Sequence, residues 1–217
     1  LLKCGNDAAC VNTRRSDIAA AFFIEQEFQQ TGAFIYNVYQ SSLGRPPGYP
    51  EYTADRKLVI GGPELETEKA AFAASFVKRA EFLQQYQGNT TGESFVDALL
   101  QQVWQTSNVD LGAQRGVLLG LYQTGADMNQ SRALVLRQLV SDPWLRQGTY
   151  NPAFVLTEYF AYLRRNPEPD GYAFWLNVLN NREAGNFRGM VCSFITSAEY
   201  QNRFSAVVSH NNGECRR

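Results

Sequence analysis

The stretch "RRNPEPDGYAFWLNVLNN" (residues 164–181) joins a proline-rich turn directly to an apolar helix face. Pro167 and Pro169 prevent the preceding helix from continuing, because proline lacks the backbone N–H and its ring clashes with the previous turn. Asp170 is predicted to cap the helix that follows. Four apolar residues of that helix recur at i, i+3, i+4 and i+7: Tyr172, Trp175, Leu176 and Leu179. The turn therefore reverses the chain, and the Trp175 helix is expected to pack on the helix that contains Phe154.

One helix signature recurs along the chain: an aromatic residue, four further residues, then glutamate and a second aromatic. The copies run from Phe22 to Glu27-Phe28, from Phe76 to Glu81-Phe82 and from Phe194 to Glu199-Tyr200, with a weaker copy, "QLVSDPW", that ends at Trp144. Glycines follow three of the copies and are predicted to end helices in the left-handed conformation: Gly32, Gly88 and Gly148. A phenylalanine and a β-branched residue then open the next helix, at Phe34-Ile35, Phe95-Val96 and Phe154-Val155. These spacings predict a repeat of roughly 55 to 60 residues.

The recurring glutamate is predicted to lie in the first turn of a short closing helix. There its charge complements the helix macrodipole, and Ser141 and Ser197 are expected to cap two of these helices. The aromatic residues at helical spacing are predicted to form the core. Because Glu27, Glu81 and Glu199 recur from unit to unit, whereas catalysis needs one site, we expect no catalytic role for them.

The repeats predict a mainly α fold, an irregular helical bundle built from four units. The expected boundaries are 1–32 for the tail of a first unit, 33–88 for the second, 89–148 for a degenerate third, 149–204 for the fourth and 205–217 for a C-terminal tail. An insertion at 48–67, "GYPEYTADRKLVIGGPELET", interrupts the second unit. Its prolines and glycines break helices and "KLVI" is β-prone, so we expect a long loop with room for a small hairpin.

Composition limits the classes of function. The 217 residues are 44% hydrophobic and 19% charged, enough for one sizeable core or two smaller ones. Twenty Lys and Arg balance 21 Asp and Glu, so no excess of positive charge attracts nucleic acid, and we expect no such partner. The longest apolar run, "IAAAFFI" (18–24), is far shorter than a bilayer needs, so the chain is not expected to span a membrane. Its start, "LLKCGNDAAC", is interpreted as the beginning of a processed piece or a fragment.

Four cysteines lie near the two ends of the sequence: Cys4, Cys10, Cys192 and Cys215. Disulfides from Cys4 to Cys10 and from Cys192 to Cys215 are the favoured reading, with free thiols as the alternative. A metal site is disfavoured, because the one histidine, His210, lies in the polar tail. Disulfides would place the protein in an oxidising compartment, secreted or at the cell surface.

The sequence disfavours a calcium loop, a histidine-based nucleophile and a phosphate-binding loop. Three residues alternate like the start of a calcium loop: Asn166, Glu168 and Asp170. The match then fails, because Asn177 stands where a bidentate glutamate is required. His210 lies beyond the last predicted helix, which disfavours a Ser-His-Asp or Cys-His enzyme, and no phosphate-binding loop is present. Paired carboxylates remain open, yet we expect no enzyme and no cofactor.

A family resemblance rests on two motifs of the last third. Arg165-x-Pro167-Glu168-x-x-Gly171-x-x-Phe174-Trp175, followed by Phe194…Ser197-x-Glu199-Tyr200, resembles the bacterial family called domain of unknown function 4214, whose pattern is L-G-R-x-P-D-x-x-G-x-x-Y-W and then F-x-x-S-x-E-[FY]. Arg164 replaces a glycine of that pattern and Glu168 an aspartate. The second unit keeps Leu43-Gly44-Arg45-Pro46-Pro47, whereas the third has lost the turn motif and the first retains its tail alone.

The resemblance implies a helical layout similar to that of phycobilisome-linker domains, in the C-terminal part of a large secreted bacterial protein. It assigns structural roles, and no catalytic ones, to Arg165, Pro167, Gly171, Trp175, Glu199 and Tyr200. The expected function is a non-catalytic structural or interaction module that docks on itself or on another surface protein. The alternative is a carbohydrate-binding module, because 13% of the residues are aromatic. Exposed side chains of Tyr49, Tyr52 and Trp104 would favour that alternative.

Overall fold

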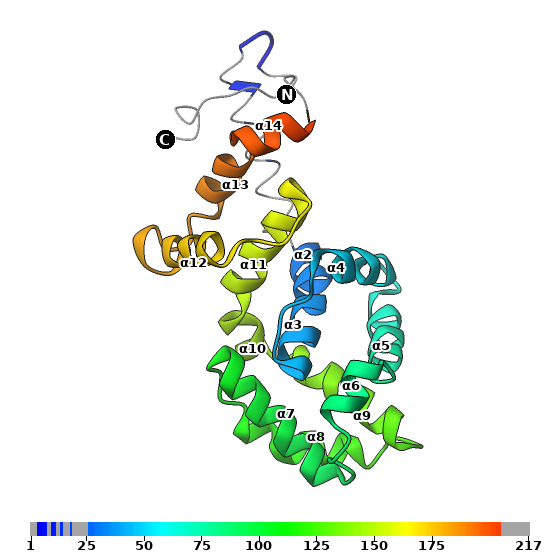
Figure 1. Ribbon diagram of the computed structural model, residues 1–217. Helices are drawn as coiled ribbons and strands as arrows, with labels where there is room; N and C mark the ends of the chain where they lie inside the picture. The colour runs from blue at the N-terminus through cyan, green and yellow to red at the C-terminus, as the bar shows by residue number, and fades with distance from the viewer. Residues whose placement is uncertain (1–3, 8–9, 12–13, 15–17, 19–25, 205–217) are drawn as a thin grey trace. The chain divides into compact units, whose positions relative to one another are not determined.

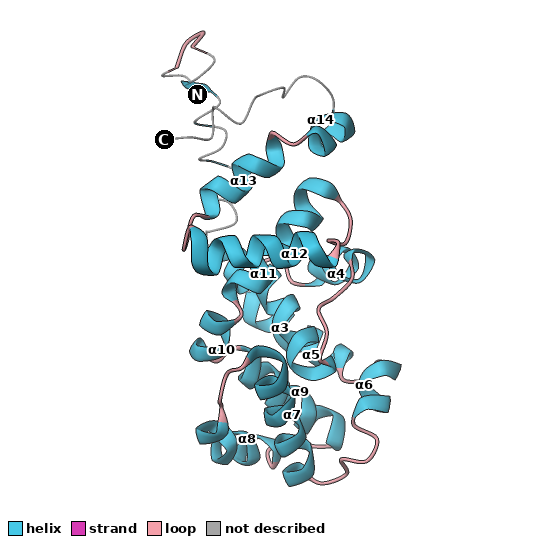
Figure 2. Ribbon diagram, turned by 60° about the vertical axis from the view of Figure 1, so that its left-hand side comes forward, coloured by secondary structure: helices cyan, strands magenta, loops and turns pink. Residues whose placement is uncertain are grey.

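The computed structural model of the protein describes residues 4–7, 10–11, 14, 18 and 26–204. All regular structure in these ranges is helical, and Figure 2 accordingly shows helices joined by loops. The prediction of a mainly α helical bundle is confirmed. None of the described helices combines the length and the apolarity that a bilayer crossing needs.

The chain divides into two compact units, which we call the central unit (30–150) and the terminal unit (1–29 with 151–217). Figure 1 labels their helices. The helices up to the end of the central unit are α2 (Gln26–Gln30), α3 (Gly32–Leu43), α4 (Tyr49–Asp55), the 3-10 turn η1 (Arg56–Leu58), α5 (Leu65–Phe76), α6 (Ala80–Gln85), α7 (Gly92–Ser107), the 3-10 turn η2 (Gly112–Gln114), α8 (Arg115–Tyr122), α9 (Met128–Val140) and α10 (Pro143–Gly148). Those that follow are α11 (Tyr150–Glu158), the π-helical turn η3 (Tyr159–Leu163), α12 (Pro169–Asn177), the π-helical turn η4 (Val178–Arg182), α13 (Phe187–Ile195) and α14 (Ala198–Phe204).

The core of the central unit surrounds α3, whose residues 32–42 are all buried. This helix contacts α4, α6, α7 and α9, so it has no face left for solvent. Aromatic rings connect the layers: Phe34 lies 5.9 Å from Phe72, and Phe82 lies 6.1 Å from both Phe76 and Phe95. Full burial of one such side chain contributes about 1.5–3 kcal/mol, so these rings add substantially to the stability that the buried aliphatic residues of the same core provide.

The terminal unit packs around Phe154 of α11, which is fully buried. Its ring lies 6.4 Å from Phe28 of α2 and 4.8 Å from Phe187 of α13. The Tyr172 hydroxyl of α12 donates to the carbonyl oxygen of Pro152, 3.0 Å away, so the helix after the proline turn does return to α11. Trp175, however, packs on Phe194 of α13, with ring centres 5.6 Å apart.

The prediction of a long loop over 48–67 is wrong for most of the segment, because it holds α4, η1 and the start of α5, whereas residues 59–64, with the Gly-Gly-Pro sequence, lie outside helices as predicted. Pro50 lies in the first turn of α4, where a missing N–H leaves no hydrogen bond broken. The Glu51 carboxylate accepts the Gly48 N–H at 2.7 Å and stabilises the same turn. "KLVI" forms no strand in the described structure: it ends η1 and then buries Val59. Proline and glycine thus mark a helix start here.

Two of the three predicted N-cap residues are also wrong. Glu168 is the N-cap residue of α12 in place of Asp170, because Pro169 occupies the first helical position. Asp142, one residue after the predicted Ser141, caps α10 by accepting the Trp144 N–H at 2.8 Å. Ser197 is confirmed as a cap, since its Oγ accepts the Tyr200 N–H at 3.1 Å.

In the second, third and fourth sequence repeats, a residue in the left-handed conformation follows the opening helix. None of the three glycines predicted for this role is among these residues. The residues with φ between 50° and 71° at these ends are Gly44 after α3, Asn108 after α7 and Arg164 after η3. Gly32, Gly88 and Gly148 have no positive φ. The left-handed turn thus directly precedes Arg45 and Arg165, which places these two arginines in the same local geometry.

Candidate functional site

Arg165 is the centre of an ion-pair cluster in the terminal unit, which we call the Arg165 cluster (Arg165, Glu168, Glu199 and Tyr159). Its guanidinium donates twice to the Glu199 carboxylate, at 2.6 and 2.8 Å, and Nη1 lies 2.8 Å from a Glu168 oxygen. The same guanidinium lies 5.3 Å from the centre of the Tyr159 ring. Planar bidentate pairing of this kind fixes orientation as well as charge. The cluster therefore fastens the proline turn to α14.

Arg45 repeats this arrangement in the central unit, as the Arg45 cluster (Arg45, Glu51, Glu81 and Tyr39). It donates twice to Glu81, at 2.7 and 2.6 Å, and twice to Glu51, at 2.9 and 2.7 Å. Its guanidinium is also 5.3 Å from the ring centre of Tyr39. The signature glutamates Glu81 and Glu199 lie in the first turn of α6 and of α14, as predicted. Their partners are the arginines of the turn motif.

The ring contacts beneath the two clusters correspond as well. Tyr39 meets Phe76 and Tyr159 meets Phe194, each pair edge to face with centres 4.9 Å apart. Each tyrosine stands six residues before its arginine. The sequence repeat is therefore a structural repeat, at least between the second unit and the fourth.

The other motif residues of the last third support the same turn. A Cβ on Gly171 would come 2.5 Å from the Tyr159 hydroxyl, so any larger residue would force the Tyr159 side chain to shift. Tyr200 packs on Tyr162, with ring centres 5.9 Å apart. Pro167 lies in the turn between Arg165 and the start of α12. The arrangement accounts for the motif as a structural device.

Charge pairing sets the electrostatics of both clusters. Hydrogen bonds from Arg165 hold the pKa of Glu199 below its ordinary value. Hydrogen bonds from Arg45 do the same for the pKa of Glu51. These carboxylates thus stay ionised and paired across the neutral pH range, and none of them is poised to donate a proton.

Two of the three residues that resemble the start of a calcium loop have different surroundings. Glu168 is paired with Arg165, and Asp170 is exposed in the first turn of α12. Within the described ranges, no three His, Cys, Asp or Glu side chains gather as a metal would require. Cys4 and Cys10 form a disulfide, and Cys192 is buried and disulfide-bonded. Cys215 and His210 lie outside the described residues.

An ion pair between the buried Asp55 and the half-buried Arg79, which no sequence pattern predicts, lies in the central unit. Arg79 donates to both oxygens of Asp55, each at 2.7 Å, and the Tyr39 hydroxyl donates to Asp55 Oδ2 at 2.7 Å. Asp55 is only 5% exposed. Burial, with the hydrogen bond to Asp55 next, raises the pKa of Tyr39. Asp55 is the last residue of α4 and Arg79 directly precedes α6. No sequence motif relates these two positions, so the pair was not predicted.

Glu158 at the end of α11 is the opposite case. The residue is fully buried, and neither carboxyl oxygen has a hydrogen-bond partner in the described structure. Burial raises the pKa of this carboxyl well above its ordinary value. It precedes Tyr159 as Val38 precedes Tyr39, so an acid here replaces an apolar residue of the central unit.

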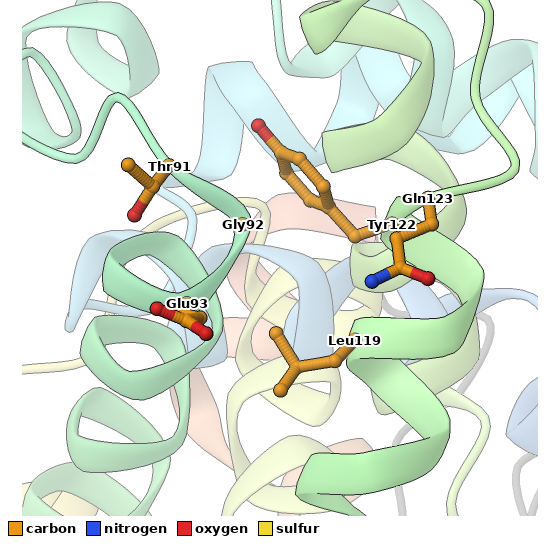
Figure 3. Close-up of a pocket in the computed structure, with 6 residues that line it drawn as sticks. All are labelled: Thr91, Gly92, Glu93, Leu119, Tyr122 and Gln123. Carbon is orange, nitrogen blue, oxygen red and sulfur yellow. The ribbon is translucent and has the colours of Figure 1, made fainter.

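The surface of the central unit carries two further features. Trp104 of α7 is 53% exposed and Trp144 of α10 is 70% exposed. A pocket of about 290 Å³ lies between the start of α7 and the end of α8, as Figure 3 shows. The residues that line it are Thr91, Gly92, Glu93, Leu119, Tyr122 and Gln123.

Comparison with known families supports the resemblance inferred from the two sequence motifs, for the last third of the chain. Residues 142–204 match the model of the family described as Domain of unknown function (DUF4214). The match runs from the cap of α10 to the end of α14 and so includes the whole Arg165 cluster. A search of curated proteins and a search of solved structures gave no match.

Proposed function

We propose that the protein is a non-catalytic interaction module of a secreted or cell-surface bacterial protein and that it assembles with protein partners, a second copy of itself first among them. Exposure of Trp144 and Trp104 carries the proposal. Tryptophan is the residue that most often dominates protein interfaces, and leaving so large an apolar side chain in water forgoes about 2 kcal/mol or more of burial free energy.

The use of the acidic residues supports a non-catalytic role. Glu51, Glu81, Glu168 and Glu199 are all paired with arginine, and Asp55 is buried with Arg79. General acid catalysis requires a carboxyl group with a raised pKa that reaches a substrate. Glu158 has the raised pKa, but it is fully buried.

The disulfides support the proposed compartment. The Cys4–Cys10 bond and the disulfide-bonded Cys192 form and persist in an oxidising environment. The family match at 142–204 is consistent with a place in the C-terminal part of a large bacterial surface protein and with a layout like that of phycobilisome-linker domains.

Sedimentation of the intact, unreduced chain over a range of concentrations tests the proposal. We expect a defined dimer or larger oligomer, and Trp144→Ala and Trp104→Ala should each weaken its dissociation constant tenfold or more. Gln147→Ala and Gln105→Ala, exposed neighbours on the same helices, are the matched controls and should leave assembly unchanged. A strictly monomeric chain at the highest concentration would contradict self-assembly.

Carbohydrate binding is the second candidate, and the exposed face of Trp104 favours it. Tyr49 and Tyr52 are half-buried, so Trp104 is the most open of the three aromatic residues considered for this role. An exposed indole offers a flat apolar surface on which a sugar ring can stack.

A further inference from the structure

We infer that the pocket between α7 and α8 binds one pyranose ring of a neutral carbohydrate. Tyr122 and Leu119 would contact the apolar C–H face of the ring, while Glu93 and Gln123 bind its hydroxyl groups. The inference rests on the second proposed function, carbohydrate binding, and gives that function a site.

The apolar wall of the pocket is held in place from behind. The Tyr122 ring packs on Phe95 of the core, with centres 6.1 Å apart. A Cβ on Gly92 would come 2.7 Å from Tyr122 Cδ1, so glycine at the start of α7 is what allows the ring to lie there. Leu119, one turn earlier on α8, extends the same surface. A fixed, partly exposed tyrosine is suited to a ligand with one apolar face and polar edges.

The polar groups at the rim are available to a ligand. Figure 3 shows Glu93 and Gln123 on opposite sides of the space between the helices. Neither side chain makes a hydrogen bond or ion pair within the described structure, whereas Asp97, one turn along α7, is held by Arg115 at 2.6 and 2.9 Å. A carboxylate accepts and a carboxamide both donates and accepts, which matches the two roles of a sugar hydroxyl.

The same features disfavour other ligand classes. Glu93 would repel a phosphate or a carboxylate, and the neighbouring cation, Arg115, is already paired with Asp97. A purely apolar ligand would remove Glu93 and Gln123 from water without replacing their hydrogen bonds. A volume of about 290 Å³ is at the lower end of small-molecule sites, which suits a single ring.

The test is a titration of the intact, isotope-labelled chain with methyl glycosides of glucose, galactose, mannose and N-acetylglucosamine, followed by NMR. We expect at least one glycoside to shift the backbone amides of Gly92 and Gln123. Tyr122→Ala should weaken binding tenfold or more, and Glu93→Gln several-fold. Because Glu93 is exposed, Glu93→Gln keeps the test decisive if Tyr122→Ala fails to fold.

Val117→Ala is the matched control, since it shortens an exposed apolar side chain of α8 that does not line the pocket and should leave the affinity unchanged. Shifts centred on Trp104 that vanish in Trp104→Ala would overturn the pocket as the site and leave carbohydrate binding, at Trp104, standing. No shift with any glycoside would overturn both. Binding of tetramethylammonium without binding of a glycoside would also overturn the inference, in favour of a cation over the Tyr122 ring.

Discussion

Asp55 in the central unit and Glu158 in the terminal unit are both buried carboxyl groups, but only Asp55 has a partner in the described structure. The partly exposed ion-pair clusters of the two units share the bidentate pair between the arginine and the signature glutamate and the 5.3 Å arginine–tyrosine distance, and they differ in the second glutamate, which is paired twice at Glu51 and once at Glu168. The repeat has therefore kept the device that fastens its turn, while its interior has diverged. The recurring motif shows which contacts hold each turn in place. The buried acids lead us to expect different effects of substitution on the stability of the two units.

The buried carboxyl group of Glu158, which has no partner among the described residues, makes the stability of the terminal unit depend on pH. Burial raises the pKa of Glu158 well above 4.5, its ordinary value. Between these two values the unfolded carboxyl is ionised and the folded one is protonated, so the unfolded state binds fewer protons. The contribution of Glu158 to the free energy of unfolding of the terminal unit should therefore be most favourable below about pH 4.5, fall as the pH rises, and level off above the folded pKa.

The largest expected effect is in the central unit, on replacing Arg79. Arg79→Met leaves the buried Asp55 carboxylate without its cation, and because the Arg79 side chain is itself 34% exposed we expect a cost of about 3 kcal/mol, at the lower end for such pairs. Urea unfolding should show this loss for the central unit. The double variant Asp55→Asn with Arg79→Met should recover part of the stability, since no charge is then left unpaired. Equal losses in the single and double variants would contradict the role of the pair.

The next effect has the opposite sign and lies in the terminal unit. Glu158→Val, which installs the residue found at Val38, should stabilise the unit by about 1–3 kcal/mol at neutral pH, because an unsatisfied buried group is removed. Thermal unfolding at pH 7 and at pH 4 measures it, and the gain should shrink at the lower pH. Glu158→Gln is the isosteric control for charge alone. A variant less stable than the natural chain at pH 7 would reveal a partner for Glu158.

A smaller effect is expected from the ion-pair clusters themselves. Glu199→Gln in the terminal unit and Glu81→Gln in the central unit should each cost about 1 kcal/mol, because the pairs are bidentate but partly exposed. Unfolding at low and high salt should show that both losses diminish as salt screens the pairs. A cost for one cluster and none for the other would break the equivalence of the two units.

The smallest effect concerns the left-handed residues before the arginines. Arg164→Gly relieves a non-glycine φ of 50° and loses the contact of the Arg164 guanidinium with the Phe204 ring, 4.7 Å away. The first change is worth about 1 kcal/mol and the second opposes it by about half, so we expect a net gain of about 0.5 kcal/mol. Gly44→Arg, the reverse exchange, should destabilise the central unit. A stability loss in Arg164→Gly would show that the Phe204 contact outweighs the strain.

Much of the fold was predictable from sequence, because helical spacing and the repeated signature report on the core directly. The placement of Glu81 and Glu199 in first turns followed from the same pattern. The segment 48–67 was misread, since Pro50 can start a helix as well as end one. The arginine partners were missed although Arg45 and Arg165 stood in the motif, because pairing across 36 or 34 residues has no local signal.

The most direct measurement of the contrast between the two units is the pKa of Glu158 itself, from NMR of the side-chain carboxyl carbons, with Glu158→Gln to assign the signal. Burial without a partner predicts a pKa well above 4.5, while the pKa of Glu199, paired with Arg165, falls below that value in the same titration. A Glu158 that titrates at 4.5 or lower would contradict the account, because it would show a carboxyl group that is solvated or paired.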